Sequence, residues 1–225
     1  MENINWHSNA KERWDENASN WHSRSVDMWM NGSRKDILPF FKKNVESGSS
    51  VADLGCGDGF GSYLLHKSGY DVTGMDLSEK MVELAKKQEQ PGLRFVQGDL
   101  ANLPFEDNSF DSCFAINSIE WTETPYHALQ ELTRIVRNDG CICIGLLGPT
   151  AHPRSNSYPR LLGEKVICNT MMPWELEQLA REMELDKVDE TWVYKNGVKQ
   201  ALTENLSNEL KQSLTFMTLF CFKKK

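Results

Sequence analysis

The stretch Val51-Ala-Asp-Leu-Gly-Cys-Gly-Asp-Gly-Phe-Gly61 decides the fold of this chain. With Ser50, its first residues form a short apolar run of the length expected for a buried β-strand. The glycines at positions 55, 57 and 59 let the backbone turn tightly and approach a ligand without side-chain obstruction. Open α/β sheets bind nucleotides at such a turn, where the first strand ends. The stretch therefore predicts a ligand site at a strand-to-helix turn.

Outward from this turn, short apolar runs alternate with helical patterns, which is typical of βαβ units around a parallel sheet. Strands are expected at 50–54, 71–75, 93–96, 110–116 and 141–147, and helices at about 59–68, 78–88 and 124–137. Ser78 is a good N-cap, and residues 138–140 predict a helix stop and a turn into the next strand. A further helix is expected from Pro173. Two closing β-like runs, 187–195 and 213–222, predict an antiparallel hairpin at one sheet edge.

Two regions differ from this alternation. In residues 1–45, Trp6, Trp14, Trp21 and Trp29 recur at seven- to eight-residue intervals, so helical structure places them on one stripe. Such a region is either a helix pair packed on the domain or a lid over a ligand, and both can hold. Residues 46–225 are expected to form the main domain. Within it, the proline-rich start of segment 149–172 predicts an irregular loop on the substrate side.

Composition excludes several classes of function. The net charge of −7 and pI near 5.3 oppose a nucleic-acid partner, because phosphate binding needs a basic face. No apolar run reaches the roughly 20 residues of a membrane span. The polar first 20 residues do not resemble a secretory signal, so a cytoplasmic protein is expected. The six cysteines have no zinc-site spacing, which predicts reduced thiols and no metal centre.

Two further carboxylates follow later apolar runs. Asp76 lies 23 residues after Asp53, where an acidic group can accept hydrogen bonds from both hydroxyls of a ribose. Asp99 ends the third run, where it can accept a hydrogen bond from an adenine amine. Each of these aspartates alone is more readily a turn former or a helix cap, but that reading does not explain three of them at successive strand ends. The spacing of a dinucleotide-binding G-x-G-x-x-G is absent because Phe60 occupies its last position, which disfavours a nucleotide-dependent oxidoreductase.

Together, VADLGCGDGFGSYL, VTGMDLSEKMVELAKK and FVQGDLANLPFEDNSFDSCFAINSIEW resemble class I S-adenosylmethionine-dependent methyltransferases, in particular the small-molecule branch of quinone biosynthesis. The resemblance covers about residues 37–147. It implies a Rossmann-like α/β fold with a seven-stranded, mostly parallel sheet, helices on both faces and an antiparallel last strand. It also implies S-adenosylmethionine as cofactor, S-adenosylhomocysteine as product and a small-molecule methyl acceptor.

The resemblance assigns cofactor contacts to nine positions. The methionine part is expected over Gly55, Cys56 and Gly57, with Asp53 near its amino group and the backbone of Asn117 facing it. The adenosine part is expected at the remaining four positions: Asp76 at the ribose hydroxyls, Leu77 beside the adenine, Asp99 at its amine and the Leu100 backbone at the ring.

The acceptor and the catalytic groups stay open. Asn117-Ser-Ile-Glu-Trp121 stands where several nucleic-acid and protein methyltransferases carry an Asn/Asp-Pro-Pro-aromatic motif, so those acceptors are disfavoured. Five polar residues near the expected pocket are candidate bases, and none is singled out: Glu120, His127, His22, His152 and Tyr158. The expected pocket walls are the N-terminal tryptophans, Trp121 and the loop 149–159. Every motif concerns the cofactor, so a non-catalytic cofactor-binding protein is the alternative, and the oligomeric state is undetermined.

Overall fold

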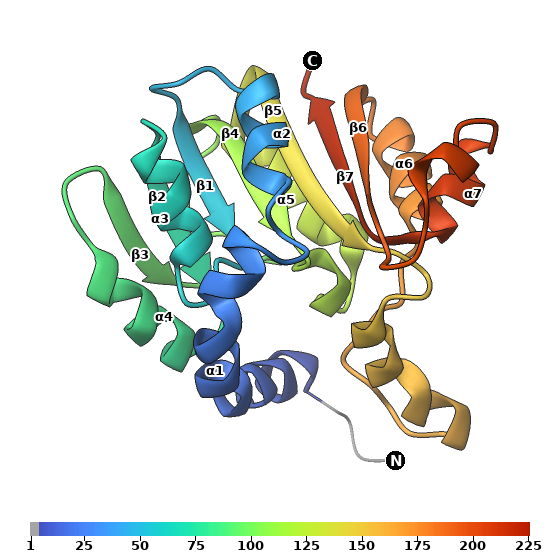
Figure 1. The fold of residues 1–225 in the computed structure, drawn as a ribbon. Helices are drawn as coiled ribbons and strands as arrows, with labels where there is room; N and C mark the ends of the chain where they lie inside the picture. Colours follow the sequence, from blue (N-terminus) through green and yellow to red (C-terminus); the bar gives the residue numbers. More distant parts are fainter. Residues whose placement is uncertain (1–4) are drawn as a thin grey trace.

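The computed structural model describes residues 5–225, so the first four residues of the expected 1–45 region lie outside it. The described residues form one sheet whose strands stand in the order β3-β2-β1-β4-β5-β7-β6 (Figure 1). The first five strands of this order run parallel, and β7 runs antiparallel to both of its neighbours. The strands are β1 (Ser50–Leu54), β2 (Asp71–Asp76), β3 (Leu93–Gln97), β4 (Phe110–Ile116), β5 (Val136–Leu147), β6 (Asp186–Tyr194) and β7 (Thr215–Lys223).

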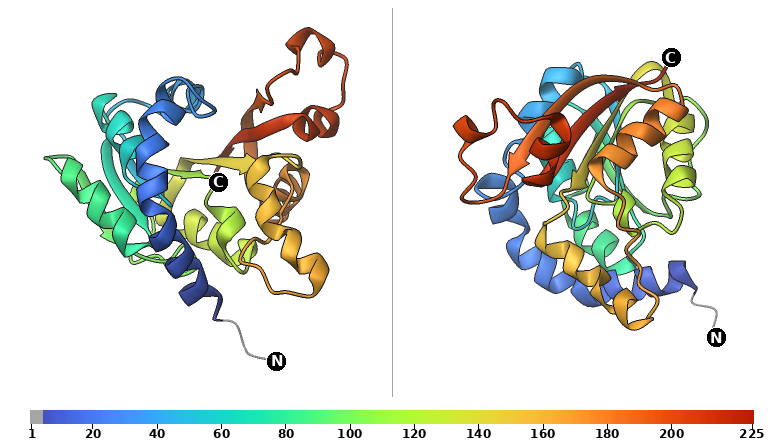
Figure 2. Two further views of the ribbon diagram at one scale, coloured as in Figure 1. Left: turned by 60° about the horizontal axis from the view of Figure 1, so that its bottom comes forward. Right: turned by 90° about the vertical axis from the view of Figure 1, so that its right-hand side faces the viewer.

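Helices cover both faces of this sheet (Figure 2). The α-helices are α1 (Trp6–Met30), α2 (Ile37–Asn44), α3 (Phe60–Lys67), α4 (Glu79–Ala85), α5 (Pro125–Ile135), α6 (Pro173–Glu182) and α7 (Asn208–Ser213). The 3-10 segments are η1 (Lys86–Gln88), η2 (Ile119–Trp121), η3 (His152–Leu162) and η4 (Gln200–Leu202). The expected Rossmann-like α/β fold with a seven-stranded sheet is confirmed. None of the helices within residues 5–225 is long and apolar enough to cross a membrane.

Side-chain alternation along the strands builds two apolar cores. In β4, Cys113 and Ala115 pack with α5 and α6 on one face, while Phe114 and Ile116 pack with α2, α3 and α4 on the other. Successive residues of a strand point to opposite faces, so the unbroken apolar runs seen in the sequence are those of a sheet covered on both sides. The end of α1 joins the second core through Trp29.

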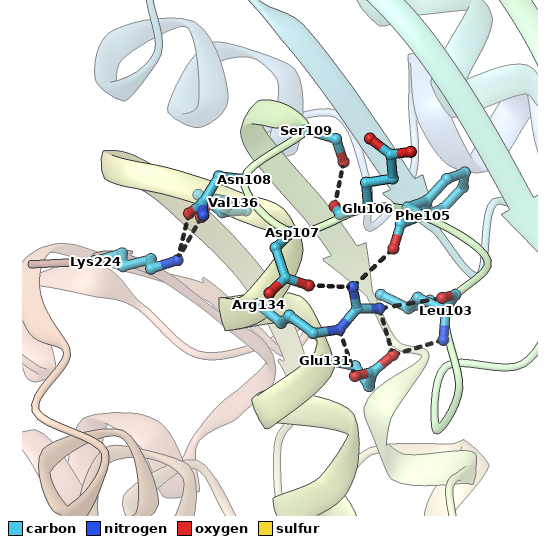
Figure 3. A network of polar contacts seen from close by, with 10 residues as sticks. All are labelled: Leu103, Phe105, Glu106, Asp107, Asn108, Ser109, Glu131, Arg134, Val136 and Lys224. Carbon is cyan, nitrogen blue, oxygen red and sulfur yellow. Dashed lines mark hydrogen bonds and ion pairs between the residues drawn. The ribbon is translucent and has the colours of Figure 1, made fainter.

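A polar network fixes the connection between β3 and β4 against α5 (Figure 3). The Arg134 guanidinium donates to the carbonyls of Leu103 and Phe105 at 3.1 and 2.7 Å, and it pairs with Glu131 and Asp107 at 2.7 and 2.9 Å. Glu131 in turn accepts from the Leu103 backbone N–H at 2.7 Å. These bonds hold residues 103–107 in place. The residues just before them, 99–101, line the cavity described below.

The chain departs from expectation around the closing hairpin. The hairpin of β6 and β7 is antiparallel, as predicted, but the short helix α7 lies between its strands. In addition, β5 begins at Val136, directly after α5, although a turn was predicted at 138–140. The cause is long-range pairing: the Asp139 N–H donates to the Lys224 carbonyl at 2.9 Å, and the Lys224 N–H donates to the Gly140 carbonyl at 3.1 Å.

The predicted irregular loop is also partly wrong, because residues 152–162 form the 3-10 segment η3. Its polar side chains satisfy carbonyls three residues back: the hydroxyls of Ser155 and Ser157 donate to His152 and Arg154 at 2.7 and 2.8 Å. Such local bonds stabilise a tight turn without the hydrophobic periodicity that predicts a helix. Both α1 and η3 lie at the carboxyl ends of the parallel strands (Figure 1).

Candidate functional site

The glycine-rich turn follows β1 as predicted and is tightly packed. Gly55 has φ +80°, and a Cβ atom added there would lie 2.4 Å from the Cβ of Ser118. The N–H groups of Gly55 and Cys56 donate to the Met75 carbonyl at 2.8 and 2.9 Å, which ties the turn to the end of β2. A side chain at position 55 would therefore need both an unfavourable φ and space that Ser118 already fills.

A cavity of about 210 Å³ opens over this turn. Seven of the nine predicted cofactor residues line it: Gly55, Gly57, Asp76, Leu77, Asp99, Leu100 and Asn117. They come from the ends of four different strands, which the parallel sheet brings to one edge.

Asp76 presents a carboxylate that the backbone holds in place. Its Oδ2 accepts from the Gly57 N–H at 2.8 Å, and its Oδ1 accepts from the Ser78 N–H at 2.9 Å. Burial raises the pKa of Asp76 to about 6, although these hydrogen bonds favour the charged form. Each carboxylate oxygen keeps further acceptor capacity for a ligand hydroxyl.

Asp99 is held by contacts on both of its oxygens. Its Oδ1 accepts from the Ala101 N–H at 3.0 Å, and its Oδ2 lies 2.8 Å from His7 Nδ1. His7 belongs to α1, so the N-terminal helix reaches the carboxylate predicted to meet the adenine. Both His7 and Ala101 line the cavity.

Two of the nine predicted residues, Asp53 and Cys56, do not line the cavity. Asp53 Oδ2 accepts from the Ser62 hydroxyl at 2.5 Å, underneath the turn, and only 3% of the residue is exposed. Burial raises the pKa of Asp53 to about 7, more than the Ser62 bond and the charge of Arg34 lower it. Cys56 packs against the core beneath the turn.

Asn117 adopts a left-handed backbone, with φ +52°, at the end of β4. Its N–H donates to the Gly145 carbonyl at 2.7 Å, and its carbonyl accepts from the Trp121 indole N–H at 3.0 Å. The backbone of Asn117, predicted to face the methionine part, thus has both groups bonded within the protein. Its side-chain Oδ1 accepts from Arg34 at 3.3 Å.

Four indole rings also line the cavity, those of Trp6, Trp14, Trp21 and Trp121. Trp14 packs edge-to-face on Trp21 and on Trp121, with ring centroids 5.9 and 5.1 Å apart. The Trp6 indole N–H donates to the Trp121 carbonyl at 2.7 Å. Trp29, the fourth member of the stripe, lies in the core instead, stacked on Phe114 at 6.2 Å. The loop 149–159, predicted as a wall, does not line this cavity.

Polar contacts attach α1 along the length of the cavity. Asp15 Oδ1 accepts from the Ser78 hydroxyl at 2.6 Å and from the Lys80 N–H at 3.2 Å. Nearer its end, His22 and Ser25 bond the two oxygens of Asp58, at 2.7 and 2.8 Å. These contacts place α1 over both the glycine-rich turn and the start of α4.

Among the five candidate bases, His127 alone lines the cavity. Glu120 is fully buried, its Oε1 accepts from the Leu147 N–H at 2.6 Å, and burial raises the pKa of its carboxyl. The other three lie elsewhere: His22 on Asp58, and His152 and Tyr158 on η3.

Arg34 is a residue of the cavity that no sequence pattern indicated. Arg34 lies in the connection between α1 and α2 and lines the cavity. Only 7% of the surface of Arg34 is exposed. Its guanidinium carbon lies 4.8 Å from the Trp21 ring and 5.4 Å from the Trp29 ring. No motif surrounds it, and the tryptophan spacing was the one signal in this region.

Comparison with known proteins shows which domain family and which relatives this chain resembles. A methyltransferase domain family matches residues 52–144. A malonyl-[acyl-carrier protein] O-methyltransferase of Pectobacterium atrosepticum is 38% identical over 120 residues, covering 53% of this chain and 47% of that protein. A demethylmenaquinone methyltransferase of Paenarthrobacter aurescens is 35% identical over 101 residues, covering 45% and 40%. The chain thus spans about half the length of the curated relatives it matches.

The fold comparison extends over nearly the whole chain. A putative methyltransferase, solved in complex with the Haloferax volcanii Trm112 activator, superposes with a TM-score of 0.74. It is 21% identical, and the match covers 95% of this chain and 96% of that one. At this identity the likeness concerns the fold.

The cavity suits the cofactor of this family, S-adenosylmethionine. The backbone of Gly55 and Gly57 lines the cavity, and Asp76 and Asp99 contribute carboxylate groups to the same lining. The domain match, the fold and these residues agree. Residues 52–144 thus match a methyltransferase domain, and the relatives and solved structure named above are methyltransferases that this chain resembles.

Proposed function

We propose that this protein transfers the methyl group of S-adenosylmethionine to a small-molecule acceptor held between α1 and Trp121. The observation that carries the proposal is one cavity whose lining combines two kinds of residue. Strand-end residues contribute polar groups for the cofactor, and Trp6, Trp14, Trp21 and Trp121 contribute indole rings. Aromatic walls suit a flat or partly apolar acceptor, and they exclude water from the reacting atoms.

The residues of the cavity act mainly by positioning. When bound, S-adenosylmethionine supplies a methyl group activated by its positive sulfur. Asp76 would hold the ribose hydroxyls and Asp99 the adenine amine, and the tryptophans would orient the acceptor. Such positioning contributes up to about 7–11 kcal/mol in favourable cases. If the acceptor must lose a proton during methyl transfer, His127, which lines the cavity, is the residue that takes it up.

Charge and relatives support an acceptor that is not a nucleic acid. The net charge of −7 opposes phosphate binding. The two relatives above are named for a malonyl group on a carrier protein and for demethylmenaquinone. A cytoplasmic location is part of the proposal, supported by the six cysteines, all free thiols in this structure.

Calorimetric titration with S-adenosylmethionine and S-adenosylhomocysteine tests the proposal. Dissociation constants in the micromolar range, about −8 kcal/mol, are expected for the unaltered protein. Asp76→Ala is expected to weaken both at least about tenfold, because it removes charged hydrogen-bond acceptors. Asp71→Ala, an exposed aspartate at the other end of β2, is the control and leaves binding unchanged.

Binding of neither ligand by the folded, cofactor-free protein contradicts the proposal. Where binding holds, a screen of small-molecule acceptors measures methyl turnover. Cofactor binding without turnover of any acceptor favours the alternative, a non-catalytic protein that kept the cofactor pocket.

A further inference from the structure

The charged groups that line the cavity are mainly acidic. Its lining includes three carboxyl groups, those of Asp76, Asp99 and Glu123, and one guanidinium, that of Arg34. The chain as a whole carries a net charge of −7. Carboxylates attract cations and repel anions, most strongly in a cleft with low-dielectric walls. The cavity therefore favours a positively charged ligand over an anionic one.

Glu123 is the one of these carboxyl groups with no predicted contact to the cofactor. Asp76 and Asp99 are expected at the ribose and at the adenine, and both also accept hydrogen bonds from the protein. Glu123 lies between η2 and α5, two residues after Trp121. Within residues 5–225 its side chain forms no ion pair. Its charge is thus available to a second ligand in the cavity.

Indole faces supply the other feature that binds a cation. Trp14 stands nearly perpendicular to Trp21 and to Trp121, at interplanar angles of 88° and 89°, so the faces of these cavity-lining rings point in different directions. The face of an indole attracts a cation, and sites built from several aromatic rings bind ammonium groups. Trp21 already holds one cation, because the Arg34 guanidinium carbon lies 4.8 Å from its ring centroid. Among the described residues, no cation lies over the ring of Trp14 or of Trp121.

We propose that the methyl acceptor is an amine, bound as an ammonium ion by the Glu123 carboxylate and the rings of Trp14 and Trp121. The proposal rests on the proposed function and names the chemical class of its acceptor. It explains why a cavity lined by indole rings also carries a carboxylate beyond those expected at the cofactor. A neutral aromatic acceptor would make no use of the charge of Glu123, and an anionic acceptor would be repelled by it.

An ammonium ion must lose a proton before its nitrogen can accept a methyl group. His127 lines the cavity in α5, four residues after Glu123, and its exposed side chain can take up this proton and pass it to solvent. The nitrogen lone pair then forms the bond to the methyl carbon, while the bond from that carbon to sulfur breaks and its electron pair stays on sulfur. The products are a methylated ammonium ion and the neutral thioether S-adenosylhomocysteine. The positive charge moves from sulfur to nitrogen, so Glu123 and the indole faces stabilise it after the transfer as well.

The test compares probes of matched shape and different charge: phenethylamine, 2-phenylethanol and 3-phenylpropanoate. Calorimetric titration of the full chain, saturated with S-adenosylhomocysteine, is expected to show the amine binding at least about tenfold more tightly than the alcohol. The carboxylate is expected to bind more weakly than the alcohol. Tryptamine and indole-3-ethanol repeat the comparison with a larger ring.

Variants of Glu123 connect this preference to the structure. Glu123→Gln is expected to weaken the amines about tenfold and to leave the alcohols within about twofold. Glu123→Asp keeps a carboxylate and is expected to retain a preference for the amines. Glu83→Gln, at an exposed position of α4 outside the cavity, is the control and changes neither class of probe.

The outcomes separate this inference from the proposed function. An alcohol or a carboxylate that binds as tightly as its matched amine overturns the amine class, as do equal losses of amine and alcohol in Glu123→Gln or binding of none of the probes. With S-adenosylmethionine, the amines that bind are expected to gain a methyl group on nitrogen, which mass spectrometry detects, and amines that bind without being methylated overturn their role as acceptors. In each of these cases the proposed function stands if another acceptor is methylated. A protein that does not bind S-adenosylhomocysteine overturns the proposed function itself, and the cofactor titration shows this before any probe is added.

Discussion

Gly55 is a position where even the methyl group of alanine would clash with a neighbouring side chain. Gly55→Ala would place a Cβ 2.4 Å from the Cβ of Ser118, in a left-handed backbone. We expect it to lower the free energy of unfolding by about 2–4 kcal/mol, the sum of backbone strain and overpacking, and to weaken S-adenosylhomocysteine at least about tenfold. Urea unfolding and calorimetry measure the two effects.

A matched glycine separates the two causes. Gly163 has φ +84° but nothing within 4 Å of an added Cβ, so Gly163→Ala should cost only about 1–2 kcal/mol and leave ligand binding unchanged. Adding Ser118→Gly to Gly55→Ala removes the clashing atom and should recover part of the lost stability. If Gly55→Ala and Gly163→Ala behave alike, steric packing at the turn is not the reason for glycine there.

For residues of the glycine-rich turn and the strand ends, the sequence predicted the position in the fold better than the contacts of the side chain. The glycines lie in the turn after β1 and Asp76 at the end of β2, as predicted, because strand ends and left-handed turns are local properties. Asp53 was predicted beside the ligand, and its carboxylate turned out to bond Ser62 in α3 instead. Sequence spacing gives the position of a residue along a strand, but the nearest hydroxyl in three dimensions decides which group its side chain contacts.

Among the elements, α1 contributes five residues to the lining of the cavity, and Asp15 is a testable point of its attachment. Asp15→Ala removes the bonds to Ser78 and Lys80. We expect faster hydrogen exchange in residues 6–20 and an about threefold to tenfold weaker affinity for S-adenosylhomocysteine. Hydrogen exchange followed by mass spectrometry gives the first quantity, and calorimetry gives the second.

Asp27→Ala is the matched control for this helix. Asp27 is exposed on α1 and its side chain bonds Asn31 of the same segment, so neither quantity should change beyond its immediate surroundings. A helix α1 that exchanges at the same rate in both variants would show that Asp15 does not hold it against α4. Under that result, the role of α1 as a cover for the cofactor would need other contacts.

For the molecule as a whole, two buried carboxylates make stability depend on pH. Burial raises the pKa values of Asp53 and Asp76 from 3.8 to about 7 and about 6. The folded protein therefore holds protons that the unfolded chain has already released. The contribution of these two carboxyl groups to the free energy of unfolding is full below pH 4 and is lost as the pH rises through 6 and 7. The ligand-free protein should therefore be less stable at pH 8 than at pH 5.

Asp53→Asn should remove much of this dependence. The variant cannot ionise, so the fall in unfolding free energy between pH 5 and pH 8 should shrink by about 2 kcal/mol. Urea unfolding at the two pH values measures it, with the exposed Asp27→Asn as control. An unchanged fall in Asp53→Asn would mean that Asp53 ionises in the folded protein as readily as in the unfolded chain.

The sequence by itself determined the α/β class, the parallel strands, the glycine turn and the carboxylates at successive strand ends. Each of these follows from local periodicity, backbone conformation and the rule that parallel strands end at one edge of a sheet. The strand ends agree with the structure to within a residue for β1 and β4. Family resemblance then supplied the cofactor.

The tertiary structure alone decided which distant segments meet at that edge. It brought Arg34 beside Asn117, laid α1 across the cavity with three of its four spaced tryptophans facing in, and extended β5 through pairing with Lys224. These arrangements depend on contacts between residues tens of positions apart, and no period in the chain encodes such contacts. The physical reason is tertiary packing, which brings Arg34 and the indole rings to one cavity from segments that are distant from Asn117 in the sequence.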